Sequence, residues 1–301
     1  MGDSDFSIPS TFTSFTKTWH SESYATISPT RPELSASGKN VVVTGGGTGI
    51  GKHIAIAFAH AGAQSISILG RREDRLVTSS KAITDAAQES KNAVKVLYRV
   101  TDLTKKANVD ESFTSLAGEV GPLHILISNA GVFPGAGPLA TVSADSLMAG
   151  FETNVRGALY SIQAFLPLAS SGPDGSAPMI LNIGTGTHMA PIPGIGPYMV
   201  SKAANHKMID YIATENPKVH VVNVCPGVIE TEMSEPNKDS VSHWDSPDLP
   251  GHFCVWLASQ EAKFLKSKTV WANWDADEMM SRKEEIQSSR LLTWLLDGVP
   301  M

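Results

Sequence analysis

A tyrosine and a lysine spaced four residues apart are the side chains best placed to carry chemistry. Tyr198 and Lys202 share one face of any helix that contains both, because residues four apart are neighbours on a helix surface. A free phenol has a pKa near ~10, too high for acid–base work at neutral pH. An adjacent ammonium favours the phenolate and lowers that pKa. The spacing therefore predicts an acid–base group, with an ordinary helix pair as the alternative.

A glycine-rich segment upstream, TGGGTGIG at residues 44–51, is the second chemical signal. It follows the valine run 41–43 and precedes an apolar stretch with helical character. Gly45, Gly49 and Gly51 have no Cβ, so the backbone can turn tightly and approach a pyrophosphate. The first turn of the following helix offers free N–H groups to the phosphates. The segment predicts a dinucleotide site, with a purely structural glycine turn as the alternative.

The end of the second predicted strand bears on which dinucleotide is bound. A site that prefers NAD usually has Asp or Glu there, to bond the ribose 2′-hydroxyl. This chain has Gly70 followed by Arg71 and Arg72. Guanidinium groups can hold a 2′-phosphate, so we predict NADP(H) as cofactor. The alternative is that both arginines are simply solvated.

Short apolar runs alternate with helical patterns from Lys39 onward. This alternation predicts an α/β fold, a doubly wound parallel sheet of the Rossmann type in a single domain. The predicted strands cover residues 41–43, 66–69, 94–100, 123–127, 179–183 and 219–224. The predicted helices cover residues 50–61, 72–90, 105–119 and 198–214, with two more helical stretches between 143 and 168. We expect an N-terminal arm over 1–38, a catalytic domain over 39–275 and a C-terminal helical tail over 276–301.

Composition narrows the function classes. The net charge of −6 and the lack of a long basic run argue against nucleic acid or an anionic membrane as partner. No apolar run reaches the roughly 18 residues of a transmembrane helix. Cys225 and Cys254 form no CxxC pair, which favours free, buried thiols and a cytoplasmic location. The nine histidines show no metal-ligand spacing, so no catalytic metal is expected.

Three aromatic residues in the arm have helical spacing. Phe12, Phe15 and Trp19 occupy positions i, i+3 and i+7, one face of a short helix. We expect the arm to lay these rings on its own core or on a partner subunit. The alternative is a disordered tail.

Several further motifs occur in a fixed order along the chain. They are Asp102-Leu103, Asn129-Ala130-Gly131, Asn154 in NVRG, YMVSK at 198–202, and Pro226-Gly227 followed by Thr231. Together with the glycine-rich segment, they resemble the motifs of short-chain dehydrogenases/reductases over residues 39–275. The arm and the tail, with Trp271-Ala272-Asn273-Trp274, are similar to fungal members linked to secondary metabolism. The resemblance implies a homodimer or homotetramer.

The resemblance also implies cofactor contacts. Asp102 would contact the adenine end, Asn129 would line the cleft, and Thr231 with Val228 would orient the nicotinamide carboxamide. The implied cofactor-binding set is Gly45, Gly47, Thr48, Gly49, Ile50, Gly51, Arg71, Arg72, Asp102, Leu103, Asn129, Ala130, Gly131, Tyr198, Lys202, Pro226, Gly227, Val228 and Thr231.

The implied catalytic set is Asn154, Thr185, Tyr198 and Lys202. Asn154 would hold a water in a proton relay, and Lys202 would bond the nicotinamide ribose and lower the pKa of Tyr198. The family places a serine thirteen residues before the tyrosine, where this chain has Thr185. Threonine keeps the hydroxyl donor, but its methyl takes space beside the reacting carbon. Thr187 is a weaker candidate for the same role.

Loops beyond the carboxyl ends of the strands should form the substrate pocket. The candidates are Phe133, His188, Met189, Ile192, Ile195, Met233 and Trp244. This mostly apolar set suits a hydrophobic alcohol or ketone. His188 is a candidate polar anchor or auxiliary acid, but a packed or surface histidine is the favoured interpretation.

The sequence thus predicts an oxidoreductase that transfers a hydride between NADP(H) and a carbonyl or secondary alcohol. Two alternatives remain: an epimerase, dehydratase or isomerase using bound cofactor, and a dinucleotide-binding scaffold that has lost its chemistry.

Overall fold

A seven-stranded parallel sheet forms the centre of the molecule, with the strand order β3-β2-β1-β4-β5-β6-β7. The computed structural model describes residues 14–187, 191–235 and 241–296. The strands are β1 Asn40–Thr44, β2 Ser65–Gly70, β3 Lys95–Val100, β4 Ile125–Ser128, β5 Met179–Ile183, β6 His220–Cys225 and β7 Thr269–Trp271. Successive strands are added on one side of β1 up to β3 and on its other side from β4 onward, so the strand order reverses between β1 and β4. Ligands bind at such switch points in open α/β sheets.

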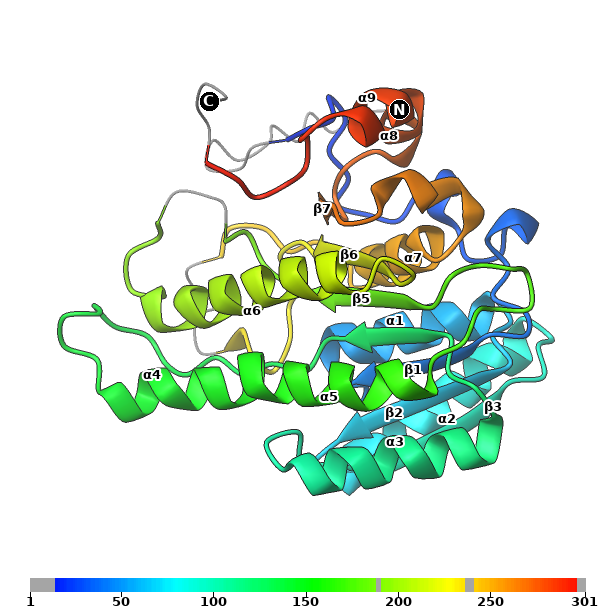
Figure 1. Cartoon of the computed structure of the whole chain (residues 1–301), viewed down its shortest axis with the longest axis horizontal. Coiled ribbons are helices and arrows are strands. Elements are labelled where there is room, and N and C mark those ends of the chain that lie inside the picture. Colours follow the sequence, from blue (N-terminus) through cyan, green and yellow to red (C-terminus); the bar gives the residue numbers. More distant parts are fainter. Residues whose placement is uncertain (1–13, 188–190, 236–240, 297–301) are drawn as a thin grey trace.

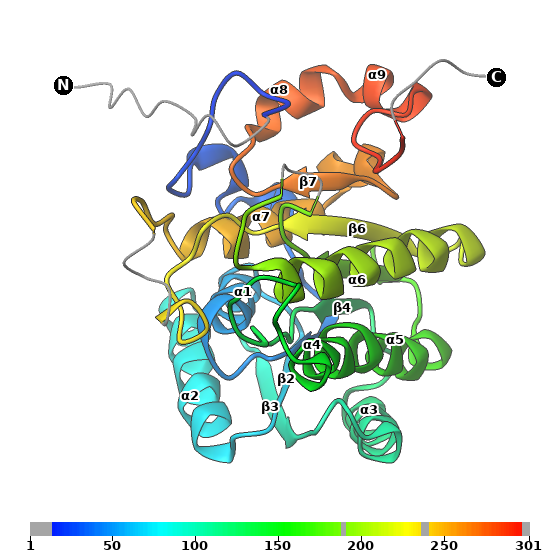
Figure 2. The same ribbon diagram turned by 90° about the vertical axis from the view of Figure 1, so that its left-hand side faces the viewer.

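Helices cover both faces of this sheet. They are α1 Gly49–His60, α2 Glu73–Glu89, α3 Lys106–Val120, α4 Ala144–Phe151, α5 Ala158–Phe165, α6 Gly196–Glu215, α7 Asp248–Leu257, α8 Ala276–Ser281 and α9 Lys283–Ser288. Short 3₁₀ segments cover Ala25–Ile27, Pro32–Leu34, Leu166–Leu168 and Gln260–Leu265. Figure 2 shows α1, α2 and α7 on one face of the sheet and α3, α5 and α6 on the other.

Each face has its own hydrophobic core. Phe58 of α1 and Trp256 of α7 belong to one core. Phe113 of α3 and Phe165 of α5 belong to the other. Because the central strands are buried on both faces, they are continuous apolar runs rather than alternating ones. This double burial confirms the predicted α/β fold in a single domain.

The six predicted strands are all present, but β7 and α7 were not predicted. β7 has only three residues, too few for a periodic signal. Pro250 and Gly251 are residues that usually interrupt a helix, yet Pro250 lies in the first turn of α7, where proline is tolerated. Gly251 lies where α7 packs on α1, since a Cβ there would come within 2.8 Å of the His53 carbonyl oxygen.

The helix from α4 to α5 contains a π-helical segment, Glu152–Gly157, and Figure 1 shows the two helices in one line. Such segments are rare and often occur at functional sites. Asn154 lies in this segment, and its carbonyl accepts a hydrogen bond of 2.8 Å from Asn205 Nδ2 of α6. Asn205 Oδ1 in turn accepts from Asn182 Nδ2 of β5 at 2.8 Å. These buried amides fix α6 relative to the π-helical segment.

The N-terminal arm packs on the chain's own core. Phe15 lies 5.9 Å from Trp274 and Trp19 lies 5.7 Å from Trp271, measured between ring centroids. The helix predicted from their spacing is wrong for the described residues 14–20, which bend instead and form a bridge between Trp19 and Trp274. Phe12 lies outside the described residues. The arm therefore uses its aromatics for side-chain packing without helical structure.

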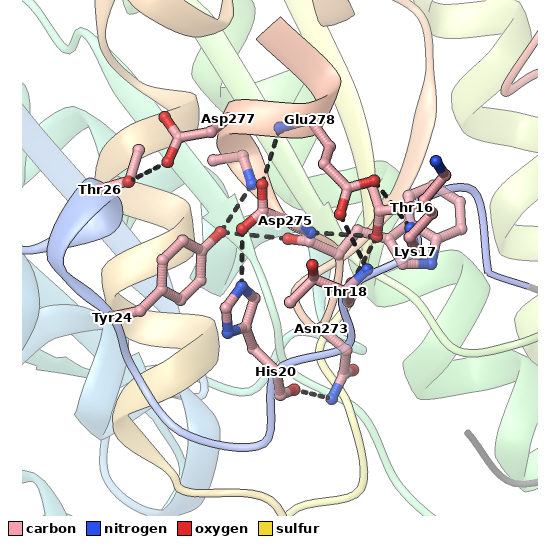
Figure 3. A network of polar contacts seen from close by, with 12 residues as sticks. Thr16, Lys17, Thr18, His20, Tyr24, Thr26, Asn273, Asp275, Asp277 and Glu278 are labelled. Carbon is pink, nitrogen blue, oxygen red and sulfur yellow. Dashed lines mark hydrogen bonds and ion pairs between the residues drawn. The ribbon is translucent and has the colours of Figure 1, made fainter. Parts of the chain in front are cut away.

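A polar network ties the arm to the segment that begins α8 (Figure 3). Glu278 accepts the backbone N–H groups of Lys17 and Thr18, each at 2.8 Å. Asp275 caps α8 by accepting the N–H of Glu278 and also bonds His20. The arm and α8 consequently share one set of charge-assisted hydrogen bonds.

We expect Glu278→Gln to lower the free energy of unfolding by about 1 kcal/mol at pH 7, since an amide replaces a carboxylate that accepts two backbone N–H groups. Burial opposes ionisation of Glu278, but the bonds from Lys17 and Thr18 prevail and lower its pKa. The stabilisation is therefore complete above the unfolded pKa of roughly 4.3 and is lost as the pH falls through the folded pKa. Thermal unfolding at pH 7 and in acid tests this, with Glu284→Gln on exposed α9 as control. An equal effect of both variants would contradict it.

Both cysteines are free and buried, as predicted. No helix among the described residues is long and apolar enough to cross a membrane. Across the same parts of the chain, no group of three or more His, Cys, Asp or Glu side chains is arranged to hold a metal ion.

Candidate active site

A cleft of about 500 Å³ lies at the carboxyl ends of the strands, beside the switch point between β1 and β4. Most of the residues predicted for cofactor, catalysis and substrate line it together. They are Gly45, Gly47, Thr48, Gly49, Ile50, Arg71, Arg72, Asp102, Leu103, Asn129, Ala130, Gly131, Phe133, Thr185, Ile195, Tyr198, Lys202, Pro226, Gly227, Val228, Thr231, Met233 and Trp244.

Three predicted residues are missing from the described lining of the cleft. Gly51 lies behind the glycine-rich turn, and Ile192 is 44% exposed outside the cleft. Asn154 is buried beneath the cleft, where its side-chain amide bonds both backbone polar groups of Val132 and the hydroxyl of Ser201. Asn154 thus positions the loop after β4, and its proton relay stays a prediction. His188 and Met189 lie outside the described residues.

The glycine-rich turn has the close contacts that a dinucleotide site requires. Gly45 and Gly49 have φ values of +68° and +52°. A Cβ at Gly51 would lie 2.4 Å from the Gly45 carbonyl oxygen, so only glycine fits there. Asn129 Nδ2 holds the turn by donating to the carbonyls of Thr44 at 2.9 Å and Gly45 at 3.3 Å. This turn leads directly into α1 at Gly49, so the free N–H groups of the first helical turn lie at the cleft beside glycine backbone. Such N–H groups can bind the oxygens of a pyrophosphate.

Arginines gather beside the glycine-rich turn, where β2 leads into α2, and a Cβ added to Gly47 would lie 3.4 Å from Arg75 Cβ. Arg71, Arg72 and Arg75 all line it. Arg72 bonds Glu232 at 2.8 Å, and Arg75 bonds the other oxygen of the same carboxylate at 3.0 Å. Arg75 and Glu232 were not predicted. Arg75 could have been found from its position one helical turn after Arg72, but the partnership with Glu232 spans 160 residues and has no local signal.

Asp102 faces this arginine end after β3. Its carboxylate accepts hydrogen bonds from Thr104 Oγ1 at 2.8 Å and from Thr104 N at 3.0 Å. These bonds lower the pKa of Asp102, helped by the charges of Lys105 and Arg71. Asp102 is therefore an ionised acceptor, suited to the polar edge of an adenosine.

Tyr198 and Lys202 lie on the first turns of α6, and both face the cleft. Burial raises the pKa of Tyr198 to about 12 and lowers the pKa of Lys202 to about 8. Lys202 Nζ donates to the Ile183 carbonyl at 2.8 Å. The shift of the Tyr198 pKa runs opposite to the predicted one, because burial disfavours the phenolate and Cys225 adds to that effect. At neutral pH the phenol is therefore protonated and Lys202 is mostly cationic.

The two candidate hydroxyls after β5 are used differently. Thr185 lines the cleft, and its carbonyl accepts from the thiol of Cys225 at 3.2 Å and from the N–H of Thr187 at 2.7 Å. Thr187 Oγ1 instead bonds His206 Nδ1 at 3.2 Å. Of the two residues, Thr185 therefore lines the cleft, while the Thr187 side chain contacts α6.

The turn after β6 is held by Asp245, with Asn273 packed close behind it, and neither residue was predicted to belong to the site. Gly227 has φ +91°, and a Cβ there would lie 2.6 Å from Asp245 Oδ2 and 3.0 Å from Asn273 Oδ1. Asp245 is buried and accepts the N–H of Val228 at 2.8 Å. This support fixes the backbone of the cleft wall opposite the glycine-rich turn.

Comparison of the sequence with known protein families identifies the family to which this chain belongs. The sequence model of the short chain dehydrogenase family matches residues 39–242, more than half of the chain. The chain belongs to the short-chain dehydrogenase/reductase family. A short chain dehydrogenase/reductase of the fungus Claviceps purpurea is 34% identical over 284 residues, covering 92% of both chains. The predicted resemblance to fungal members of the family is thus confirmed.

Solved structures of short-chain dehydrogenases/reductases share the fold. One, from Burkholderia cenocepacia in complex with NADP, is 23% identical with a TM-score of 0.68, covering 80% of this chain and 99% of that one. A 3-ketoacyl-(acyl-carrier-protein) reductase from Brucella melitensis, complexed with NADH, is 25% identical with a TM-score of 0.69, covering 79% and 97%. This short-chain dehydrogenase/reductase therefore belongs to a family of oxidoreductases that bind a nicotinamide dinucleotide.

Proposed function

We propose that this protein is an NADP(H)-dependent oxidoreductase that interconverts a carbonyl group and a secondary alcohol on a hydrophobic small molecule. The observation that carries the proposal is that Thr185, Tyr198 and Lys202 all line the same cleft, with Lys202 Nζ bonded to the carbonyl of Ile183, two residues before Thr185. A hydroxyl donor, a phenol and an ammonium at one place can stabilise and protonate a developing alkoxide.

Each of these side chains has a separate part in the reaction. Bound nicotinamide cofactor supplies the hydride in reduction and accepts it in oxidation. In reduction, the protonated phenol of Tyr198 donates its proton to the substrate oxygen, while Thr185 Oγ1 donates a hydrogen bond to the same oxygen. Lys202 is cationic at neutral pH and stabilises the phenolate that remains on Tyr198. In oxidation, the same phenolate accepts the proton from the alcohol.

The hydrophobic substrate class follows from the cleft wall near Tyr198. Phe133 lies 5.5 Å from the Tyr198 ring, measured between ring centroids, and Ile195, Met233 and Trp244 also line the cleft. Apolar and aromatic walls around a few polar groups are typical of sites for hydrophobic small molecules.

The preference for NADP(H) rests on the arginines and not on the fold, because related structures hold either dinucleotide. Gly70 leaves the end of β2 without a carboxylate that would repel a 2′-phosphate. Arg72 and Arg75 come from one turn of α2 and converge on a single carboxylate, which shows that both guanidinium groups can reach one anion. A 2′-phosphate, like a carboxylate, presents negatively charged oxygens that guanidinium groups can bind.

The cofactor assignment is tested by replacing both arginines with glutamine. We expect wild-type protein to bind NADPH at least tenfold more tightly than NADH, about 1.4 kcal/mol. The double variant should lose most of that preference through weaker NADPH binding, with the NADH affinity within about twofold, because charge-assisted bonds to a phosphate are lost. Energy transfer from the tryptophans to the reduced nicotinamide reports both affinities. A wild-type preference for NADH would overturn the assignment, and binding of neither would overturn the enzyme proposal.

A further inference from the structure

Glu232 connects the two sides of the cleft at its arginine end. It follows β6, yet its two carboxylate oxygens bond Arg72 at 2.8 Å and Arg75 at 3.0 Å, both from the start of α2. The three side chains are about half exposed, at 54%, 48% and 48%. All three residues also line the cleft. A carboxylate of this chain thus occupies the arginine pair.

The backbone around Glu232 is a compact turn seated on the glycine-rich loop. Ser234 Oγ accepts from Thr231 N at 2.8 Å and donates to Thr231 O at 2.9 Å. A Cβ added to Gly49 would lie 3.0 Å from Thr231 Cγ2, so the two turns are in close contact. Met233, the next residue after Glu232, is part of the cleft wall near the proposed substrate. Glu232 is therefore held over the cofactor path by a turn that also shapes the substrate side.

We propose that Glu232 tunes cofactor specificity by competing with the 2′-phosphate for Arg72 and Arg75, which weakens the preference for NADP(H) that these arginines provide. This inference rests on the proposed function, in which Arg72 and Arg75 bind that phosphate. The carboxylate satisfies both guanidinium groups until the phosphate of NADP(H) replaces it. A phosphate carries more charge and more acceptor oxygens than a carboxylate, so the exchange favours NADP(H). NADH has no phosphate to make the exchange and leaves the ion pairs intact.

Arg72 and Arg75 can bind the phosphate only after their ion pairs with Glu232 break. Breaking these ion pairs costs free energy, so the apparent affinity for NADP(H) is lowered. Glu232→Gln removes the competing charge and keeps the size of the side chain. We expect this variant to bind NADPH about threefold to tenfold more tightly than wild type, because exposed ion pairs each contribute little free energy. Its NADH affinity should stay within about twofold of wild type. The gain should shrink at high salt, because exposed charges are screened.

Glu230→Gln is the matched control. Glu230 is exposed, lies two residues away on the same segment, and is missing from the described lining of the cleft. The control makes the same change in net charge, so it reveals any general effect of charge on binding. We expect its NADPH and NADH affinities to stay within about twofold of wild type, since exposed charges at a distance are largely screened.

The experiment measures dissociation constants of NADPH and NADH for wild type, Glu232→Gln, Glu230→Gln and the Arg72/Arg75 double glutamine variant, by tryptophan energy transfer. Tighter NADPH binding by Glu232→Gln alone supports the inference. Unchanged or weaker NADPH binding, or equal tightening for NADH, overturns it. If NADPH binding depends on the arginines but not on Glu232, only this inference fails. If the arginine variant binds NADPH like wild type, the proposed cofactor assignment itself fails.

Discussion

Tyr198→Phe is expected to lower kcat by about 10²- to 10⁴-fold, the usual contribution of a positioned general acid or base. The substitution removes one hydroxyl and leaves the ring, which packs 5.5 Å from Phe133. We expect no other group to replace the phenol fully, because efficient proton transfer requires a group positioned at the substrate oxygen. Steady-state rates with a reducible ketone and NADPH provide the measurement.

The matched control for this variant is Tyr211→Phe, on the same helix. Tyr211 is 62% exposed and remote from the cleft lining, so its loss should leave the rate unchanged. Cofactor affinity should be unchanged in Tyr211→Phe and should fall only a few-fold in Tyr198→Phe, because the other predicted cofactor contacts remain. A Tyr198→Phe protein that turns over like wild type would contradict the mechanism and favour a scaffold.

Gly51→Ala is expected to weaken dinucleotide binding by at least about tenfold and to lower the free energy of unfolding by about 1–3 kcal/mol, the usual effect of overpacking. The added Cβ would lie 2.4 Å from the Gly45 carbonyl oxygen and 2.5 Å from Asn129 Nδ2. Since the first contact is with backbone, the glycine-rich turn itself must move. Gly51 thus affects the cofactor from behind the turn, without lining the cleft. Titration with NADPH and thermal unfolding report the two effects.

Gly118→Ala is the corresponding control for an added methyl group. Gly118 is an exposed residue of α3, and a Cβ there would have nothing within 4 Å. Replacing a helical glycine by alanine at an open site should stabilise the protein by roughly 0.5–1 kcal/mol. Cofactor affinity should not change. If Gly51→Ala changed the NADPH affinity and the free energy of unfolding no more than Gly118→Ala does, the close contact within the glycine-rich turn would not be needed for cofactor binding.

Local patterns in the sequence were sufficient to predict the sheet and the cofactor cleft. Five of the six longer strands are buried along nearly their whole length, β3 at the sheet edge is partly exposed, and the glycine-rich turn is a contiguous motif, so each signal lies within a short window. β7 was missed because three residues carry no periodicity. The arm was predicted as helical from Phe15 and Trp19, but those rings contact Trp274 and Trp271 instead, and tertiary packing overrode the local pattern.

The parts of the site that depend on distant contacts could not be predicted. Glu232 meets Arg72 across 160 residues, and Asp245 supports Val228 from outside any motif. The pKa of Tyr198 was predicted to fall because only its neighbour on the helix is visible in the sequence. Burial is a property of the whole fold, and it raises that pKa to about 12.

The most direct test of the central claim is to follow nicotinamide absorbance and product together while NADPH is mixed with protein and a panel of hydrophobic ketones. The account predicts that NADPH is consumed one for one as alcohol forms, and that Tyr198→Phe abolishes both changes. Product formation without a change in nicotinamide absorbance would contradict it and indicate an epimerase, dehydratase or isomerase. Tight NADPH binding with no product from any ketone would contradict it in favour of a dinucleotide-binding scaffold.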